Sequence, residues 1–163
     1  MKTILIALTF TLTFAISANA QSVQILNQAD APLTINEFTA QYQEGGRYSS
    51  EGIRYDVSFT NNTDQEIVAY SIGFYAFDVF NRSLGRPLSG FSVSNISPGD
   101  SDDGAWVQRV SSPSLFKDYG TGIAYVARAR LADGTVWSYD QDSILNQLQE
   151  FEESLTLDDL SSQ

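Results

Sequence analysis

Segments of strand length, each ended by a turn, fill most of the chain and most restrict how it can fold. In Ile53–Thr60 apolar and polar residues alternate, which is the period of a strand with one buried face. Glu66–Phe80 is apolar on both faces, and its β-branched and aromatic residues, with Gly73, favour a long central strand over a helix. Asp133-Gly134 predicts a two-residue type I′ hairpin connection.

The same patterns predict the rest of an all-β domain. About seven or eight strands, with turns every 8–12 residues or so, predict a two-sheet sandwich of immunoglobulin-like or fibronectin-III-like type. A closed barrel remains the alternative, because both architectures bury one face of each strand. The predicted strands are 22–27, 33–43, 53–60, 66–80, 88–95, 105–110, 122–131 and 135–139.

Strand 122–131 has an apolar face and a face that becomes polar toward the hairpin turn. Strict alternation assigns its residues to two faces. The apolar face would hold Ile123, Tyr125, Ala127, Ala129 and Leu131, and the second face Ala124, Val126, Arg128 and Arg130.

The period changes beyond residue 140. Apolar residues then recur at helical spacing, namely Ile144, Leu148, Phe151 and Leu155. We predict one amphipathic helix within 141–156, with Asp142 as its N-cap. It would cover the sandwich of residues 21–140, although docking of its apolar stripe on a partner is the alternative. Residues 157–163 are predicted to form a flexible acidic tail.

The first twenty residues have the features of a secretory signal. Lys2 is a short charged start, the apolar run Ile4–Ile16 is too short to span a bilayer, and Ala18-Asn19-Ala20 is a cleavage site of A-x-A type. An N-terminal membrane anchor is the alternative reading. We therefore expect a secreted or periplasmic protein with no membrane span after signal cleavage. The chain has no Cys, which suits an exported bacterial domain.

Composition argues against several classes of function. The chain has 9 basic and 20 acidic residues and a net charge of −11, which disfavours nucleic acids and anionic membranes as partners. It contains no His and no Cys, so Ser-His-Asp and Cys-His catalytic arrangements cannot form within it. We predict a non-enzymatic interaction module whose partner is a protein or glycan of the cell envelope.

Three carboxylates in the predicted loop Ser97–Gly104 are the first place to look for a cation. They belong to Asp100, Asp102 and Asp103. The loop departs from the EF-hand pattern at Gly104, Ala105 and Ser111. We therefore expect a solvated Pro-Gly turn and no cofactor, with calcium as the alternative.

Aromatic residues suggest a second function. Trp106, Trp137 and Tyr139 are the first candidates for a sugar-stacking platform, which would make the protein a carbohydrate-binding module. Filling of the core is the expected role of such rings in a sandwich. A glycan hydrolase that uses two carboxylates is a third hypothesis, and it needs two acids in one cleft.

Residues 57–85, VSFTNNTDQEIVAYSIGFYAFDVFNRSLG, resemble the FxLYD-type and WHy-type extracytoplasmic modules of bacteria. Phe77-Asp78 stands at the aromatic-Asp position of that pattern, with Asn61 and Gly85 at the flanking turns. A Pro-Gly-acidic turn follows at 98–100. The resemblance implies an immunoglobulin-like or fibronectin-III-like sandwich and no enzyme activity.

Overall fold

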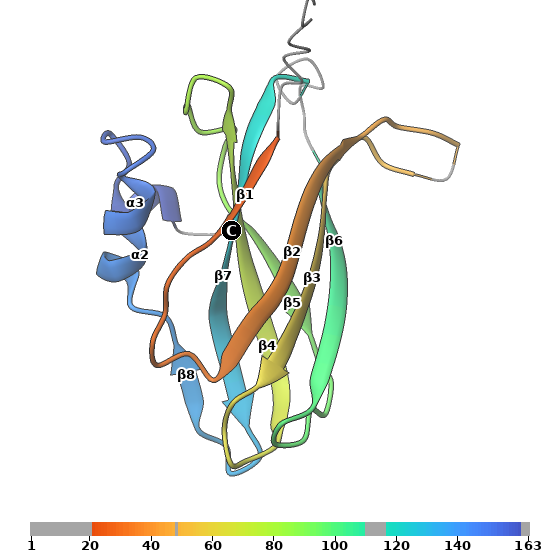
Figure 1. Cartoon of the computed structure of the whole chain (residues 1–163), viewed down its shortest axis with the longest axis vertical. Helices are drawn as coiled ribbons and strands as arrows, with labels where there is room; N and C mark the ends of the chain where they lie inside the picture. The colour runs from red at the N-terminus through yellow and green to blue at the C-terminus, as the bar shows by residue number, and fades with distance from the viewer. Residues whose placement is uncertain (1–20, 48, 110–116, 161–163) are drawn as a thin grey trace, which may run out of the picture.

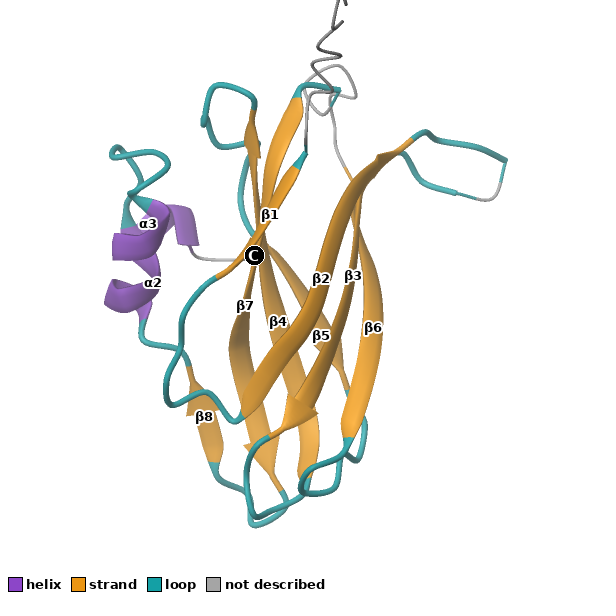
Figure 2. Ribbon diagram, viewed as in Figure 1, coloured by secondary structure: helices purple, strands orange, loops and turns teal. Residues whose placement is uncertain are grey.

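The computed structural model describes residues 21–47, 49–109 and 117–160, and the predicted signal 1–20 lies outside them. Within these ranges the chain forms two β-sheets packed face to face, with two short helices on one flank (Figures 1 and 2). None of the described helices is long and apolar enough to cross a membrane. The elements are β1 Ser22–Ile25, β2 Leu33–Gln43, β3 Gly52–Asn61, β4 Ile67–Asp78, β5 Leu88–Ser92, β6 Ser101–Arg109, β7 Tyr119–Leu131, β8 Val136–Ser138, α2 Gln141–Leu148 and α3 Leu157–Leu160.

The strand order confirms an all-β two-sheet sandwich and not a closed barrel. The larger sheet has the order β1-β7-β4-β5, with β8 also paired to β7, and the smaller sheet has the order β2-β3-β6. The pairing of β1 with β7 is parallel, whereas the other pairs are antiparallel. β1 pairs with β7 along Thr121–Ala124 and β8 pairs with it along Arg128–Arg130.

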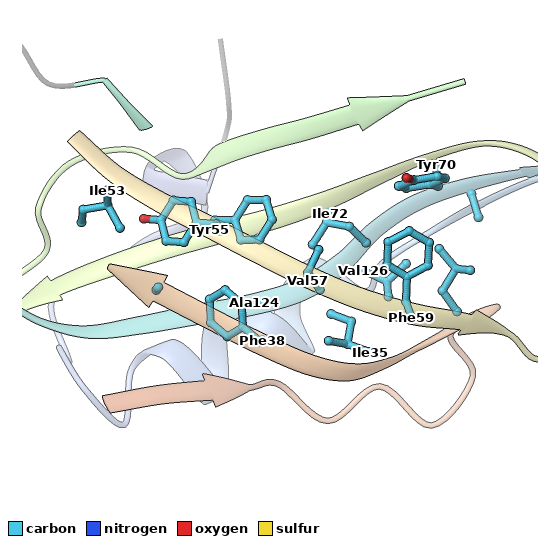
Figure 3. Close-up of a cluster of buried hydrophobic side chains, with 14 of the residues drawn as sticks. Ile35, Phe38, Ile53, Tyr55, Val57, Phe59, Tyr70, Ile72, Ala124 and Val126 are labelled. Atoms are coloured by element: carbon cyan, nitrogen blue, oxygen red, sulfur yellow. The ribbon is translucent and has the colours of Figure 1, made fainter. Parts of the chain in front are cut away.

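The main core lies between the two sheets, where side chains of β2, β3, β4 and β7 meet (Figure 3). Aromatic rings dominate it. Tyr55 of β3 stacks on Phe74 of β4 with ring centroids 4.6 Å apart, and Phe59 meets Tyr70 edge-on at 4.7 Å. Such pairs each add about 0.5–1.5 kcal/mol beyond the area they bury. These four positions alternate along their strands, as the predicted period requires.

A second core covers part of the outer face of the larger sheet. α2 and α3 pack there against Tyr75 and Phe77 of β4 and Ile123 of β7. The ring of Phe77 stacks on Phe151 at a centroid distance of 5.2 Å. The predicted helical cover therefore docks on its own sheet.

The helical segment differs from the prediction in three ways. Asp140, not Asp142, is the N-cap, and its carboxylate accepts the N–H groups of Asp142 at 3.0 Å and Ser143 at 3.3 Å. α2 ends at Leu148, well before residue 155. Residues 157–160 form α3 instead of a flexible tail, and residues 161–163 lie outside the described part.

Half of a capping box precedes α3. The carboxylate of Asp159 accepts the N–H of Thr156 at 2.8 Å and its hydroxyl at 2.7 Å, and this Thr-x-x-Asp spacing starts a helix. Leu160, which is only 3% exposed, then packs into the second core. The acidic composition of this segment had suggested a frayed end.

The predicted β7–β8 hairpin is confirmed, but its turn is not type I′. That turn needs positive φ at two successive residues, whereas here Gly134 has a φ of 93° and Asp133 does not have a positive φ. The N–H of Gly134 donates to the carbonyl of Leu131 at 3.0 Å. The connection is therefore a four-residue turn from Leu131 to Gly134, and its last residue has a left-handed conformation.

A β-bulge overturns the predicted faces of β7. Arg128 pairs with Ser71 and Val126 with Ile72, so Ala127 is an extra residue on β7. Two consecutive residues then share one face, and every later side chain changes sides. Ala124, Val126 and Ala129 lie in the main core, whereas Ile123, Tyr125 and Ala127 lie on the outer face.

Candidate binding groove

A groove of about 700 Å³ lies on the outer face of the larger sheet, beside the helices. Its floor comes from β4, where Ser71 and Gly73 project little or no side chain. Phe91 of β5 lines one side, and Arg128 and Arg130 of β7 line the other. Tyr139 and Leu160 line the part nearest the helices. Clefts of this size suit small ligands or short peptide segments.

The floor is shallow at Gly73 because a tyrosine ring lies across it. A Cβ at that position would lie 2.2 Å from Cζ of Tyr125, so glycine is required for the ring to lie there. Tyr139 packs against this ring with a centroid distance of 5.3 Å. Burial raises the pKa of the Tyr125 hydroxyl, which therefore stays protonated and neutral.

The bulge at Ala127 places two arginines on the groove. Arg128 and Arg130 both follow the bulge, both are exposed, and both line the groove. Neither makes an ion pair with any residue in the described ranges. Their guanidinium groups are the charged donors of this site.

The β5 side of the groove combines a hydroxyl pair with an exposed ring. The hydroxyls of Ser71 and Ser89 lie 2.6 Å apart and link β4 to β5. Phe91, the next residue of β5 on this face, is 66% exposed. A phenyl ring left this exposed on a strand beside a groove is available to an apolar ligand group.

Carboxylates are absent from the described residues that line the groove. No Asp or Glu is among the residues that line it, although the chain has 20 acidic and 9 basic residues. The groove therefore has the opposite charge to the protein as a whole.

The three aromatic residues predicted as a sugar platform lie in three different environments. Trp106 of β6 packs against the main core, with its ring centroid 5.5 Å from Phe74. A Cβ added to Gly90 of β5 or to Gly104 of β6 would lie 2.5 Å or less from this indole ring, so the partly buried ring lies over both glycines.

Trp137 and Tyr139 are separated from each other as well. The ring of Trp137 packs against the main core, and its indole N–H donates to Asp30 at 3.4 Å. Tyr139 alone of the predicted three lines the groove. The structure thus does not bring these rings into one flat surface.

The three aspartates predicted as a cation site are divided by the start of β6. Asp100 ends the Pro-Gly turn, whereas Asp102 and Asp103 are consecutive residues of β6 and so point to opposite faces of its sheet. The predicted loop 97–104 is thus a loop only to Asp100. Among the described residues no group of three or more acidic side chains is placed to hold a metal ion.

The Pro-Gly turn itself is formed as predicted. The N–H of Asp100 donates to the carbonyl of Ser97 at 3.0 Å, and Gly99 has a φ of 79°, as a type II turn requires. The N–H of Gly99 also donates to the carbonyl of Asn61 at 3.0 Å, which ties the turn to the end of β3.

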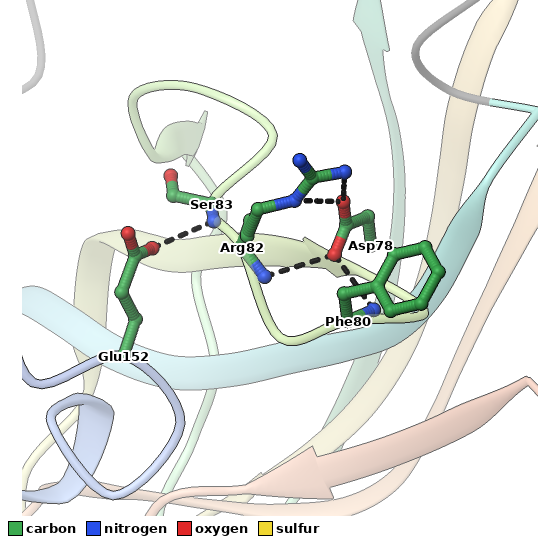
Figure 4. Close-up of polar contacts among 5 residues, drawn as sticks. All are labelled: Asp78, Phe80, Arg82, Ser83 and Glu152. Carbon is green, nitrogen blue, oxygen red and sulfur yellow. Dashed lines mark hydrogen bonds and ion pairs between the residues drawn. The ribbon is translucent and has the colours of Figure 1, made fainter.

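Asp78, the aspartate of the aromatic-Asp position in the resemblance, stabilises the loop that follows β4 (Figure 4). Asp78 is buried, and its carboxylate accepts the N–H groups of Phe80 at 2.8 Å and Arg82 at 2.9 Å, as well as the Arg82 guanidinium. Burial acts to raise the pKa of Asp78, but the hydrogen bonds and charge of Arg82 outweigh it and hold the pKa below its usual value. Glu152 accepts the N–H of Ser83 at 2.7 Å, so this loop is also tied to the helical segment.

Asn61 and Gly85 also have structural roles. The amide of buried Asn61 donates to the carbonyls of Gln65 and Ile96, each at 2.8 Å. Gly85 has a φ of 117°, a conformation that side chains rarely adopt. These positions stabilise turns and do not reach the groove.

Comparisons with known proteins bear on the fold alone. No family model and no curated protein matches the chain. A hypothetical protein of known structure from Peptoclostridium difficile 630 is similar, with 15% identity over 76% of this chain and 93% of that chain, and a TM-score of 0.54. At this identity the similarity supports the sandwich fold and no function.

Two further solved structures are more distant. The Northeast Structural Genomics Consortium target SoR45 has 14% identity, covers 65% of this chain and 79% of its own, and has a TM-score of 0.43. The putative ApaA protein from Bordetella pertussis has 14% identity, covers 66% of this chain and 85% of its own, and has a TM-score of 0.39. At TM-scores below 0.5, these two similarities support no conclusion about this chain.

Sequence reasoning missed most of the groove. Ser71, Ser89 and Phe91 belong to a short strand and its neighbour, and no motif marks them. The signals in the sequence were Tyr139, predicted as part of an aromatic platform, and the polar character of Arg128 and Arg130 near the hairpin turn. Strict alternation placed them opposite Tyr125, and the bulge puts all three on the same face.

Proposed function

We propose that this protein is an exported, non-enzymatic interaction module of the bacterial cell envelope that binds its ligand in the outer-face groove. The observation that carries this proposal is the groove itself. It leaves part of a sheet face open beside a helical cover, and it presents Arg128 and Arg130 without an acidic partner in the described chain. Clefts that combine exposed apolar side chains with a few polar or charged groups are the usual sites of ligand binding.

The proposal of a non-enzymatic role rests on side-chain chemistry. Serine hydroxyls line the groove, but the chain has no His or Cys to activate them in the usual arrangements. Hydrolysis of a glycan by two carboxylates needs both acids in one cleft, and none of the described residues that line this groove is acidic. Nothing in the groove therefore supports the hydrolase hypothesis.

The carbohydrate-binding hypothesis has less support than the interaction module. Its predicted platform of Trp106, Trp137 and Tyr139 is divided between the main core and the groove. A protein or glycan of the envelope remains the proposed class of partner. The net charge of −11 supports the proposal that nucleic acid is not a partner.

Export and family are proposed on the sequence. Residues 1–20 have the charged start, apolar run and A-x-A site of a secretory signal. The turn-stabilising contacts of Asn61 and Asp78 agree with the proposed relation to FxLYD-type and WHy-type modules and with an immunoglobulin-like or fibronectin-III-like sandwich.

A matched pair of tryptophan substitutions tests the groove. Ser89→Trp would place an indole in the groove, whereas Thr39→Trp would place one on the exposed face of β2 in the other sheet. Each purified variant is immobilised and used to capture partners from a crosslinked envelope fraction of the host. We expect the same partner with wild type and Thr39→Trp and its loss with Ser89→Trp. Equal capture of the partner by both variants would exclude the groove as the binding site.

A further inference from the structure

The groove is a positively charged surface on a negatively charged protein. The ion pairs found in the described residues join Arg54 to Asp56 and Arg82 to Asp78, so two arginines elsewhere have acidic partners. Arg128 and Arg130 have none within the described chain. At physiological ionic strength charges are screened over about 8 Å, so a ligand in the groove responds to these two arginines more than to the distant acids.

The opposite side of the groove is apolar. Phe91 of β5 lines it there, whereas Leu88 of the same strand packs against the main core. β5 and β7 are separated by β4 alone, so the arginine row and Phe91 lie about 9.6 Å apart, which is two strand spacings. A chain running between them along the strands would have a cationic row on one side and an apolar ring on the other.

The floor between the arginines and Phe91 allows a ligand backbone to approach closely. Ala69 and Ser71 of β4 form it, and neither has a side chain larger than a hydroxymethyl group, whereas the Tyr125 ring covers Gly73. The paired hydroxyls of Ser71 and Ser89 add hydrogen-bonding groups at the centre of this floor.

The spacing of the arginines matches that of an extended peptide. Residues two apart on a strand lie about 6.6 Å apart, and side chains on one side of an extended peptide repeat at the same interval. Arg128 and Arg130 are two apart, and a guanidinium binds a carboxylate through two parallel hydrogen bonds. From these observations, and on the basis of the proposed function, we infer that the groove binds an extended acidic segment of a partner protein. In this segment acidic and apolar side chains alternate, so that the acids meet the arginines and the apolar groups meet Phe91.

A pair of matched peptides tests the inference. The probe is Gly-Glu-Phe-Glu-Val-Gly with an uncharged fluorophore, and its control has Gln in place of each Glu. Binding to the full exported chain is measured by fluorescence anisotropy. Charged hydrogen bonds of this kind predict binding at least about tenfold tighter for the Glu peptide than for the Gln peptide.

Two double variants with equal loss of charge test the site. Arg128→Gln/Arg130→Gln is expected to weaken binding of the Glu peptide by about tenfold or more. Arg54→Gln/Arg109→Gln removes two arginines from the other sheet and is expected to leave binding unchanged. Equal effects of the two double variants would overturn the inference, since net charge alone would then explain binding.

The remaining outcomes separate this inference from the proposed function. If both peptides bind equally and shift the backbone amide resonances of Ser71 and Ser89, the groove is a binding site but its ligand is not selected for acidity. If polygalacturonate, at equal carboxylate concentration, displaces the probe better than unlabelled peptide does, the occupant is an acidic glycan and the peptide is excluded. If neither peptide binds, the acidic peptide is excluded, and the tryptophan variants still decide whether the groove binds a partner.

Discussion

The outer face of the larger sheet has two halves that share the same strands but differ in their side chains and in whether helices cover them. Toward the Asp78 end, β4 and β7 present Tyr75, Phe77 and Ile123, and two helices cover them. Toward the hairpin end, the same strands present Ser71 and Arg128, and no helix in the described chain covers them. The bulge at Ala127 lies at the boundary.

The difference shows how one strand pair can serve both stability and binding. Large apolar side chains need a cover, and burying each contributes roughly 1.5–3 kcal/mol. Small and charged side chains gain little from a cover, so that half can stay open at little cost. If this division is right, substitutions in the covered half should affect folding and those in the open half should affect binding.

The largest expected effect is the loss of a covered ring. Phe77→Ala removes a fully buried side chain that stacks on Phe151, and we expect the free energy of unfolding to fall by about 3–5 kcal/mol. Ser89→Ala in the open half should cost about 1 kcal/mol, for the hydroxyl pair with Ser71. Urea denaturation measures both. Similar losses would contradict the division of the face.

The boundary between the halves depends on Gly73. Gly73→Ala adds a Cβ that would lie 2.2 Å from Cζ of Tyr125, so the ring must move, and overpacking of this kind costs about 1–3 kcal/mol. In a Tyr125→Ala background the same substitution should cost almost nothing, because the clash is gone. A double-mutant cycle from urea denaturation gives the coupling, and additive losses would show that the ring does not require glycine.

The loop beyond the covered half should give a pH-dependent effect. The pKa of Asp78 in the folded protein is below its usual value, so its ionised form stabilises the fold fully above about pH 4. This contribution is lost as the pH falls from there through the folded pKa. Asp78→Asn should therefore destabilise the protein by about 1–3 kcal/mol at pH 7, and the difference from wild type should narrow at pH 3.

Asp56→Asn provides the control for that experiment. Asp56 pairs with Arg54 on the surface, where such pairs contribute about 0–1 kcal/mol. Urea denaturation at both pH values compares the two variants. A difference between wild type and Asp78→Asn that does not depend on pH would show that the charge of Asp78 is not what stabilises the loop.

A smaller effect is expected at the start of the helical cover. Asp140→Ala removes the N-cap of α2 and should cost about 1 kcal/mol. Asp142→Ala keeps that cap and removes only an acid of the first turn, so its cost should be a few tenths of a kcal/mol. The two variants also test the corrected N-cap directly. Urea denaturation measures both variants. If Asp142→Ala is less stable than Asp140→Ala, then Asp142 is the N-cap, as the sequence analysis predicted.

Sequence patterns predicted the strands well because alternation and turn residues are local. The predicted range 33–43 coincides with β2, and the predicted range 66–80 contains β4. The helical end was less accurate, because Asp140 and Asp142 are both acceptable caps and only packing selects one. The Thr156–Asp159 half of a capping box was visible in the sequence, but the acidic composition of the segment obscured it.

The groove could not be predicted from the sequence for a different reason. A bulge is one extra residue in a pairing register, and nothing in the residues around Ala127 marks it. Without the bulge, Arg128 and Arg130 would lie on the face opposite Tyr125. The site also depends on where α2 and α3 stop covering the sheet, which is a property of the packed structure.

The smallest expected effect on stability comes from the two arginines of the open half. They are exposed and have no ion-pair partner in the described chain, so Arg128→Gln/Arg130→Gln should change the free energy of unfolding by no more than about 0.5 kcal/mol. The same variant should lose capture of the envelope partner, which the far less stable Phe77→Ala should retain at temperatures where it is folded. Urea denaturation and capture, measured on one preparation of each variant, would therefore rank the two substitutions in opposite orders. The same order in both assays would mean that the open half has no function apart from the stability of the fold.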